Sequence, residues 1–401
     1  MPEKNASQDY SSGWIILLAL FTALGPLSID MYLPALPQMA DDFGVSTQQI
    51  SNTLPAYFLG LAIGQLFYGP ISDRIGRKKP LYFGMSVYAL ASLLCVVAPN
   101  DWAMIAARIL QALGGCVGVV MARAAIRDKL DLQSSAQAFA SMMIVMGLAP
   151  VLAPMIGAFI LKFLSWQAIF VVLAIIGLFC LICVHFFFAE TLPAERRLKL
   201  NFRQVFVLYS SIVQDQSFRL PMLAGCLTGA ALFCYISSAA PVFLEQFKLE
   251  PQLFSYLFGF NAFGIMLFSS LNKRLSQRLS IAQRLKLGGL IQLSGALLIF
   301  LVSCFNPSLL SIVMLGVFMT VAGIGFTGPN AMALAMSKQG SRAGTASAIM
   351  GSAQFACGLL GGVLLNFLFG SALMNMAILM LIFTGLGCVA IFKLSKSLQH
   401  A

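Results

Sequence analysis

The sequence has little charge and almost no histidine. Only 10% of its 401 residues are Asp, Glu, Lys or Arg, whereas soluble globular chains carry about 25%. The two histidines, His185 and His400, leave little material for acid–base or metal chemistry. Hydrophobic residues reach 59%, and the mean hydropathy is +0.88. These values exclude an ordinary water-soluble enzyme and point to a membrane protein.

Nothing in the sequence indicates a disulfide framework, a metal site or a cofactor. All nine cysteines fall inside or at the edge of apolar runs rather than in paired exposed loops. Cys180 and Cys183 form a C-x-x-C close to His185, but they lie within a strongly apolar run, so we interpret them as inert helix cysteines. The first apolar run contains Asp30 and lacks a small-residue cleavage site, which favours a retained span over a secretion signal.

Apolar runs of about 20 residues recur along the chain, and an α-helix of that length crosses a hydrocarbon layer roughly 30 Å thick. The pattern predicts an all-α membrane protein with twelve transmembrane helices. The expected spans are 14–38, 48–70, 81–98, 103–123, 135–161, 167–189, 220–244, 252–271, 285–304, 308–334, 343–369 and 372–392.

The basic residues predict the orientation in the membrane. Of the 25 Lys and Arg residues, 22 fall in the loops and tails on one side of the twelve spans. Only Lys162 and Lys248 fall on the other side, and Arg108 lies within a span. The positive-inside rule therefore places both termini in the cytoplasm. The same asymmetry accounts for the net charge of +11, so no nucleic-acid partner is needed to explain it.

A long basic interruption divides the spans six and six. The expected organisation is a cytoplasmic segment 1–13, a six-helix bundle 14–189, a cytoplasmic linker 190–219 with an amphipathic stretch, a second six-helix bundle 220–395 and a cytoplasmic tail 396–401. Residues 69–79 have an eroded, basic counterpart at 269–280, so the halves are pseudo-symmetric. Two related halves are typical of transporters whose site lies at their interface near the bilayer midplane.

Two charged residues, Asp30 and Arg108, are predicted to lie well inside spans. Asp30 is eight residues from Gln38 and Arg108 is seven residues from Asp101, which puts both roughly 10–12 Å below the outer surface. One interpretation is a fixed ion pair that holds spans 1 and 4 together. The other is that Asp30 exchanges a proton during transport while Arg108 competes for its charge. The forked guanidinium could then hold Asp30 together with Gln111 or a backbone carbonyl.

Methionine, aromatic and amide side chains at mid-depth predict a pocket for lipophilic compounds, although most such residues in a membrane protein face lipid. Together with the polar residues near Asp30, the candidate substrate-binding residues are Asp30, Tyr32, Arg108, Gln111, Met142, Met146, Phe233, Tyr235, Phe260, Asn261, Phe263, Gln354 and Phe355.

The motif GPISDRIGRKK at 69–79 resembles the signature between spans 2 and 3 of the major facilitator superfamily. RILQALGG at 108–115 is similar to the span-4 motif of its proton-coupled members, and GLAPVLAPMIGA is similar to the span-5 motif of its antiporters. With SIDMYLPALP at 28–37, these segments resemble the Bcr/CflA subfamily of drug:proton antiporters.

The resemblance implies a monomeric multi-pass transporter of the bacterial inner membrane, surrounded by lipid, which exchanges protons for small lipophilic drugs such as phenicols or bicyclomycin. It implies no enzyme activity. An alternative is a proton-coupled symporter or an exporter of a small metabolite such as an amino acid or a sugar. The expected conformational gate comprises Gly69, Asp73, Arg74, Gly76, Arg77, Pro150 and Pro154.

Asp73 has two possible partners. Its carboxylate could rest against the positive N-terminal end of span 11, near 341–344, and hold the cytoplasmic side shut. It could instead form an ordinary ion pair with Arg74 or Arg77.

Overall fold

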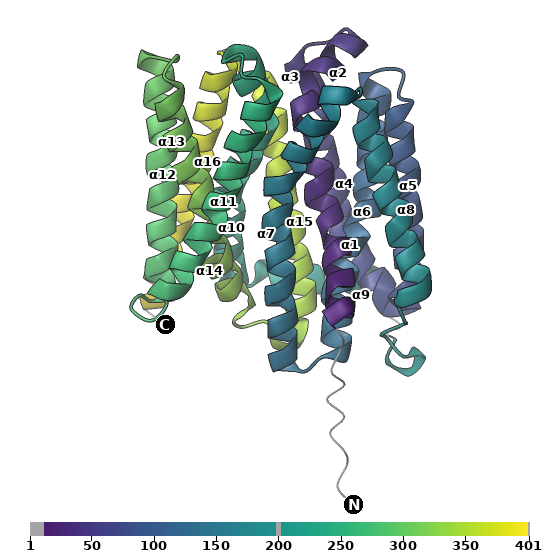
Figure 1. The fold of residues 1–401 in the computed structure, drawn as a ribbon. Coiled ribbons are helices and arrows are strands. Elements are labelled where there is room, and N and C mark those ends of the chain that lie inside the picture. Colours follow the sequence, from purple (N-terminus) through teal and green to yellow (C-terminus); the bar gives the residue numbers. More distant parts are fainter. Residues whose placement is uncertain (1–11, 198–201, 400–401) are drawn as a thin grey trace, which may run out of the picture.

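The computed structural model describes residues 12–197 and 202–399, and the described residues form helices without a strand. Twelve of the helical segments are long and apolar enough to cross a membrane, as the sequence predicts. Figure 1 shows them as one upright bundle, with the beginning of α1 and the end of α16 on the same side. We call that side the terminal face and the opposite side the distal face.

The first six spans occupy residues 12–187. Their helices are α1 Ser12–Asp30, η1 Leu33–Ala35, α2 Leu36–Phe43, α3 Thr47–Ile50, α4 Thr53–Ile75, α5 Lys78–Val96, α6 Asp101–Lys129, α7 Leu132–Phe163 and α8 Gln167–Phe187.

The remaining helices start with two short segments between the halves and continue through the last six spans. They are η2 Ala194–Arg196, α9 Phe202–Gln214, α10 Gln216–Ala239, η3 Ala240–Gln246, α11 Pro251–Leu275, α12 Ile281–Phe305, α13 Leu310–Ala322, α14 Ile324–Met336, η4 Gly340–Arg342, α15 Ala343–Leu364, η5 Leu365–Phe367 and α16 Ala372–Gln399.

The first span is broken where a single helix over 14–38 was predicted. α1 ends at Asp30, a short 3-10 turn follows at η1, and α2 completes the crossing. Pro34 lies in that turn and cannot donate a backbone hydrogen bond, which explains why the regular α-helix does not continue. The break therefore places Asp30 at a helix end deep within the bundle.

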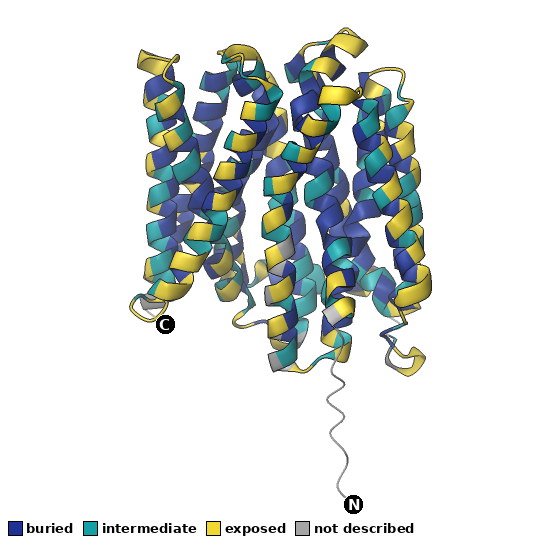
Figure 2. Ribbon diagram, viewed as in Figure 1, coloured by how far each residue is buried: buried dark blue, intermediate teal, exposed yellow. Residues whose placement is uncertain are grey.

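The two halves meet along two pairs of helices, α4 with α15 and α7 with α11. Small residues allow close approach at both contacts. A side chain at Gly351 would collide with Gln65, and a side chain at Gly362 would collide with Pro55. The Ser352 hydroxyl also donates to the Ala62 carbonyl at 2.7 Å. Figure 2 shows the buried residues concentrated between the helices and the exposed ones on the outer faces.

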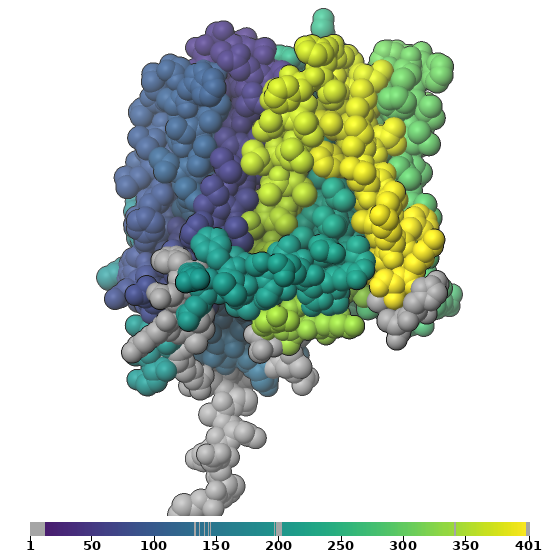
Figure 3. All heavy atoms as spheres, turned by 180° about the vertical axis from the view of Figure 1, so that it is seen from behind, coloured from purple at the N-terminus to yellow at the C-terminus, as the bar shows by residue number. Residues whose placement is uncertain are grey.

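The amphipathic stretch in the linker forms α9. Figure 3 shows this helix lying across the terminal end of the bundle, below α15. Phe206 and Val207 are exposed on it, while the Tyr209 hydroxyl donates to the Leu66 carbonyl of α4 at 2.7 Å. α9 therefore connects the first half to α15 and α10 of the second half.

Candidate functional site

Arg108 is completely buried on α6 and joins several helices of the first half. Its guanidinium donates to Oε1 of Gln111 at 2.5 Å and to the backbone carbonyl of Ser28 at 2.8 Å. The side-chain amide of Gln111 in turn donates to the Ser92 hydroxyl of α5 at 2.8 Å. One side chain thus fixes α1, α5 and α6 relative to one another.

The guanidinium also lies between two tyrosine rings. Its Cζ atom is 4.3 Å from the ring centroid of Tyr32 and 4.3 Å from that of Tyr57. Planar guanidinium groups are suited to such stacking, whereas a compact ammonium is not. The Tyr32 hydroxyl shares a 2.9 Å hydrogen bond with the Thr53 hydroxyl, so its ring is held in place. Tyr57 was not predicted, because nothing in its local sequence marks it as a cation partner.

Asp30 is buried, with 4% exposure, and forms no ion pair within the described residues. The predicted contact between Asp30 and Arg108 is therefore wrong for this structure. Arg108 instead bonds to the carbonyl of Ser28, two residues earlier on α1. Of the partners predicted for the Arg108 guanidinium, the structure contains Gln111 and a backbone carbonyl but not Asp30. Oδ1 of Asp30 has no hydrogen-bond partner.

The hydroxyl of Tyr235, a buried residue of α10, belongs to a polar pair inside the second half. That hydroxyl accepts a hydrogen bond of 3.0 Å from the Asn261 side-chain amide of α11. The second half thus contains a buried phenol–amide pair, and the first half contains the buried acid Asp30.

Three aromatic rings pack across the interface between the halves. Phe58 of α4 lies 4.7 Å from Phe233 of α10 and 6.3 Å from Phe355 of α15, measured between ring centroids. Phe233 and Phe355 are 5.5 Å apart. Phe58 was not among the predicted residues, because it lies in an uninterrupted apolar run with no distinguishing neighbour.

The other predicted pocket residues divide into two groups. Met142 is buried, Met146 is half-buried, and the half-buried Gln354 lies beside Gly229 of α10. Phe260 and Phe263 are wrong as pocket residues, because they are 55% and 50% exposed on the outer surface of α11. Phe260 stacks there on Phe318 of α13, at 4.9 Å between centroids.

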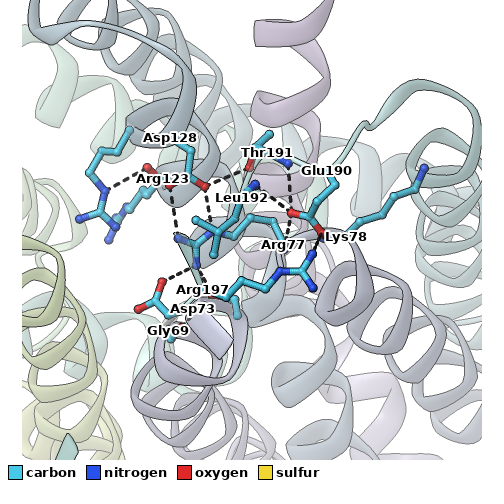
Figure 4. A network of polar contacts seen from close by, with 12 residues as sticks. Gly69, Asp73, Arg77, Lys78, Arg123, Asp128, Glu190, Thr191, Leu192 and Arg197 are labelled. Carbon is cyan, nitrogen blue, oxygen red and sulfur yellow. Dashed lines mark hydrogen bonds and ion pairs between the residues drawn. The ribbon is translucent and has the colours of Figure 1, made fainter. Parts of the chain in front are cut away.

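The motif at 69–79 forms a charged cluster at the terminal face, which Figure 4 shows from close by. The Arg77 guanidinium donates to Asp73 at 2.6 Å, to Asp128 at 2.9 Å and 3.3 Å, and to the Ser72 hydroxyl at 2.6 Å. Burial lowers the pKa of Arg77, but the two carboxylates outweigh this and raise it above its ordinary value. Asp73 is therefore paired with Arg77, as in the second of the two interpretations.

Glu190 joins the same cluster from the end of the sixth span. Its carboxylate accepts backbone N–H bonds from Arg77, Lys78, Thr191 and Leu192 at 2.8–3.2 Å. Partial burial opposes ionisation, but these amides lower the pKa of Glu190 below its ordinary value. Gly76 is required here, because its φ of +94° suits glycine and because any side chain would collide with the Glu190 carboxylate.

A cavity of about 410 Å³ separates the two halves at the terminal face. Its walls include Gly69, Asp73 and Arg127 from the first half, and Gly344 and Thr345 from the second half. Asp73 therefore shares a cavity with the start of α15 while it is bonded to Arg77. Arg74 is exposed, and no contact links it to the cluster among the described residues.

The distal face is closed by direct contacts between the halves. The Ser255 hydroxyl of α11 donates to the Pro154 carbonyl of α7 at 2.9 Å, and the Asn366 amide donates to Asn52 at 2.6 Å. Pro150 and Pro154 both lie inside α7, the helix that packs against α11. The structure is therefore closed on the distal side and hollow on the terminal side.

The Major Facilitator Superfamily profile matches residues 18–362. The chain belongs to this superfamily. A transporter of Bacillus subtilis, described as the uncharacterized MFS-type transporter YdgK, is 33% identical over 95% of this chain and 94% of its own. The bicyclomycin resistance protein homolog of Haemophilus influenzae is 31% identical over 95% and 94%. The multidrug resistance protein MdtL of Escherichia coli O157:H7 is 27% identical over 92% of both chains.

These relatives confirm the predicted resemblance to the drug:proton antiporters of the superfamily. The superfamily consists of transporters rather than enzymes, and the chain is a multi-pass protein of the inner membrane. Among solved structures, a bacterial homolog of the human lysosomal transporter Spinster, inward-facing and unoccupied, matches with a TM-score of 0.72 and 16% identity over 97% of this chain and 98% of its own. A D-xylose-proton symporter matches with 0.69 and 13% over 95% and 97%. At these identities the likeness shows the fold alone.

Proposed function

We propose that this protein exports lipophilic drugs, of the phenicol or bicyclomycin type, in exchange for protons, and that Asp30 is the carboxyl that takes up and releases the proton. The observation that carries the proposal is the position of Asp30. It is a buried acid that forms no ion pair among the described residues, and it lies where the first span breaks. Buried intramembrane acids are expensive and usually mark ion pathways.

Alternating access gives this position its function. When the distal contacts open, Asp30 gains a route to water on that side; when the terminal cavity deepens, it gains a route on the other side. A protonated carboxyl and a bound drug can then alternate at the same place. The carboxylate does not need Arg108 as a direct partner, since Arg108 holds the Ser28 backbone just before the break.

The residues at the interface between the halves support the substrate class. If the halves separate during transport, Phe58, Phe233 and Phe355 would supply aromatic walls, and the Tyr235–Asn261 pair would supply a few hydrogen-bonding groups. Such walls suit compounds that are largely apolar. The relatives named for bicyclomycin and multidrug resistance support the same class. We place the terminal face in the cytoplasm, because Lys162 and Lys248 are the basic residues assigned to distal loops, whereas the others in loops lie toward the terminal face.

The test is transport by purified protein in proteoliposomes with an imposed proton gradient. We expect movement of phenicols or bicyclomycin that a protonophore abolishes, and no movement with Asp30→Asn. Amino acids and sugars serve as the competing substrates. Gradient-driven movement of one of those, with no drug movement, would replace this function by the metabolite alternative.

A further inference from the structure

A second groove lies on the outside of the bundle, on the distal side, where α7 and α11 meet. It has a volume of about 470 Å³. Leu152, Ile156 and Phe159 of α7 line it and are 40%, 41% and 65% exposed. These residues lie within a membrane span, so the groove opens sideways into the hydrocarbon layer.

The cationic group of the groove lies at its distal end. Lys162 is at the end of α7 and Gln252 is at the start of α11. Ser255 and Tyr256 add two hydroxyls to the α11 wall, and the Ser255 hydroxyl is already bonded to the Pro154 carbonyl. From Leu152 to Lys162 is ten residues, or about 15 Å along a helix. This is about half of a hydrocarbon core roughly 30 Å thick. The α7 wall of the groove is therefore apolar over the depth of one leaflet and cationic at the level of its headgroups.

We propose that this groove binds one anionic phospholipid of the distal leaflet. Its phosphate would pair with the Lys162 ammonium and accept from the Gln252 amide, and one acyl chain would extend along Ile156 toward Leu152. Charge complementarity favours this occupant. Lys162 forms no ion pair within the described residues, and the only cation–ring contact in which it takes part is with Phe163, at 5.8 Å. Basic residues attract anionic headgroups with about 1 kcal/mol each near a membrane surface.

The lipid would also favour one conformation. Its two walls come from different halves, and they are joined beside the groove by the Ser255–Pro154 hydrogen bond. The groove exists in this form only while the distal side is closed. A ligand that binds one of two states shifts the population toward that state, so the lipid would stabilise distal closure. This inference does not depend on which substrate is carried.

Native mass spectrometry of the purified protein with added phosphatidylglycerol or phosphatidylethanolamine tests the proposal. We expect one phosphatidylglycerol to remain bound preferentially, and Lys162→Gln to weaken its retention about fivefold, since 1 kcal/mol corresponds to about that factor. Lys162→Arg should retain it. Lys248→Gln is the matched control, because it removes the other basic residue assigned to the distal loops, which does not line the groove, and should change nothing.

A second variant tests the acyl chain separately. Ile156→Trp should fill the apolar part and release the lipid although Lys162 is intact. Equal retention of both lipids, or retention unaffected by Lys162→Gln, would overturn the proposal. Displacement by glycerol phosphate would reveal a site for free phosphate instead, and a dimer released by Ile156→Trp would reveal an interface between copies of this chain. Either result would also overturn it.

Discussion

Each half of the bundle has a buried polar side chain that connects its own helices, and the two side chains differ in charge. In the first half the fully buried hub is the Arg108 guanidinium, which bonds to Ser28 and Gln111. In the second half it is Gln292 of α12, whose amide donates to the carbonyls of Thr228 and Thr320 and accepts from the Thr327 hydroxyl. One hub carries a charge and the other is neutral.

The terminal face repeats this difference. Arg77 is bonded to two carboxylates, Asp73 and Asp128. In the second half Arg284 donates to the side-chain oxygen of Asn272, which also accepts from Asn330. The comparison indicates that carboxylates at this face are paired with arginine in the first half, whereas the corresponding second-half contacts use neutral oxygen acceptors. Four predictions test this difference.

The largest difference is expected between the two hubs. Arg108→Lys should reduce transport per folded molecule roughly tenfold or more, because an ammonium cannot stack between Tyr32 and Tyr57 and also reach both hydrogen-bond acceptors. Gln292→Leu should lower stability by about 1–3 kcal/mol by leaving buried polar groups unpaired, yet keep transport per folded molecule. Transport rates normalised to folded protein measure both. Equal losses would mean that both hubs are purely structural.

The next difference concerns stability at the terminal face. Arg77→Gln should cost about 2–4 kcal/mol, because it leaves Asp128 without its cation in a partly buried site. Arg284→Gln loses bonds to neutral oxygens and should cost about 1 kcal/mol. Unfolding titrations of both variants in detergent provide the measurement. Comparable costs would contradict the expected difference between carboxylate and neutral acceptors.

A conformational effect should follow from Asp73. The carboxylate shares the terminal cavity with the start of α15, so closing that cavity would bring it to the positive end of the helix. Asp73→Ala should then favour the open terminal face and speed the labelling of cysteines introduced there on α6 and α14 several-fold. Arg74→Gln is the control, since that side chain is exposed outside the cluster. Identical labelling rates in Asp73→Ala and the native protein would contradict an interaction with the start of α15 and would show that Asp73 forms only its ion pair with Arg77.

The smallest effect should come from Glu190. Its pKa is lowered in the folded protein, so its contribution to stability is present above its unfolded pKa and is lost as pH falls through the folded value. Its partial exposure limits this to about 0.5–1 kcal/mol. Melting temperatures from pH 7 to pH 3.5 should fall less steeply in Glu190→Gln than in the native protein. Parallel curves would show that Glu190 does not contribute.

Much of this arrangement could be predicted from the sequence. The twelve spans follow from the length of the apolar runs, and the depth of Asp30 and Arg108 follows from counting residues along a helix. The direction of a side chain does not follow from such counting, because each residue turns a helix by about 100°. Phe260 and Phe263 were therefore assigned to the correct depth but to the wrong face.

The prediction of a contact between Asp30 and Arg108 is wrong for a related reason. Equal depth predicted a pair, but the break after Asp30 changes the course of the chain, and a backbone carbonyl took the place of the carboxylate. Side-chain partners can be predicted from a sequence more readily than backbone carbonyls that become available at a helix end. The stacking of Tyr57 and the position of Phe58 depend on packing between distant segments, so no local pattern could indicate them.

The central claim is that Asp30 releases a proton when drug binds, and the direct test is drug-induced proton release from purified, weakly buffered protein. Asp101→Asn is the matched control, since that acid is buried at the distal end of α6 but bonded to Gln49 at 2.7 Å. The native protein and Asp101→Asn should acidify the medium on addition of a phenicol or bicyclomycin, and Asp30→Asn should bind the drug without acidification. Undiminished proton release from Asp30→Asn would contradict the account.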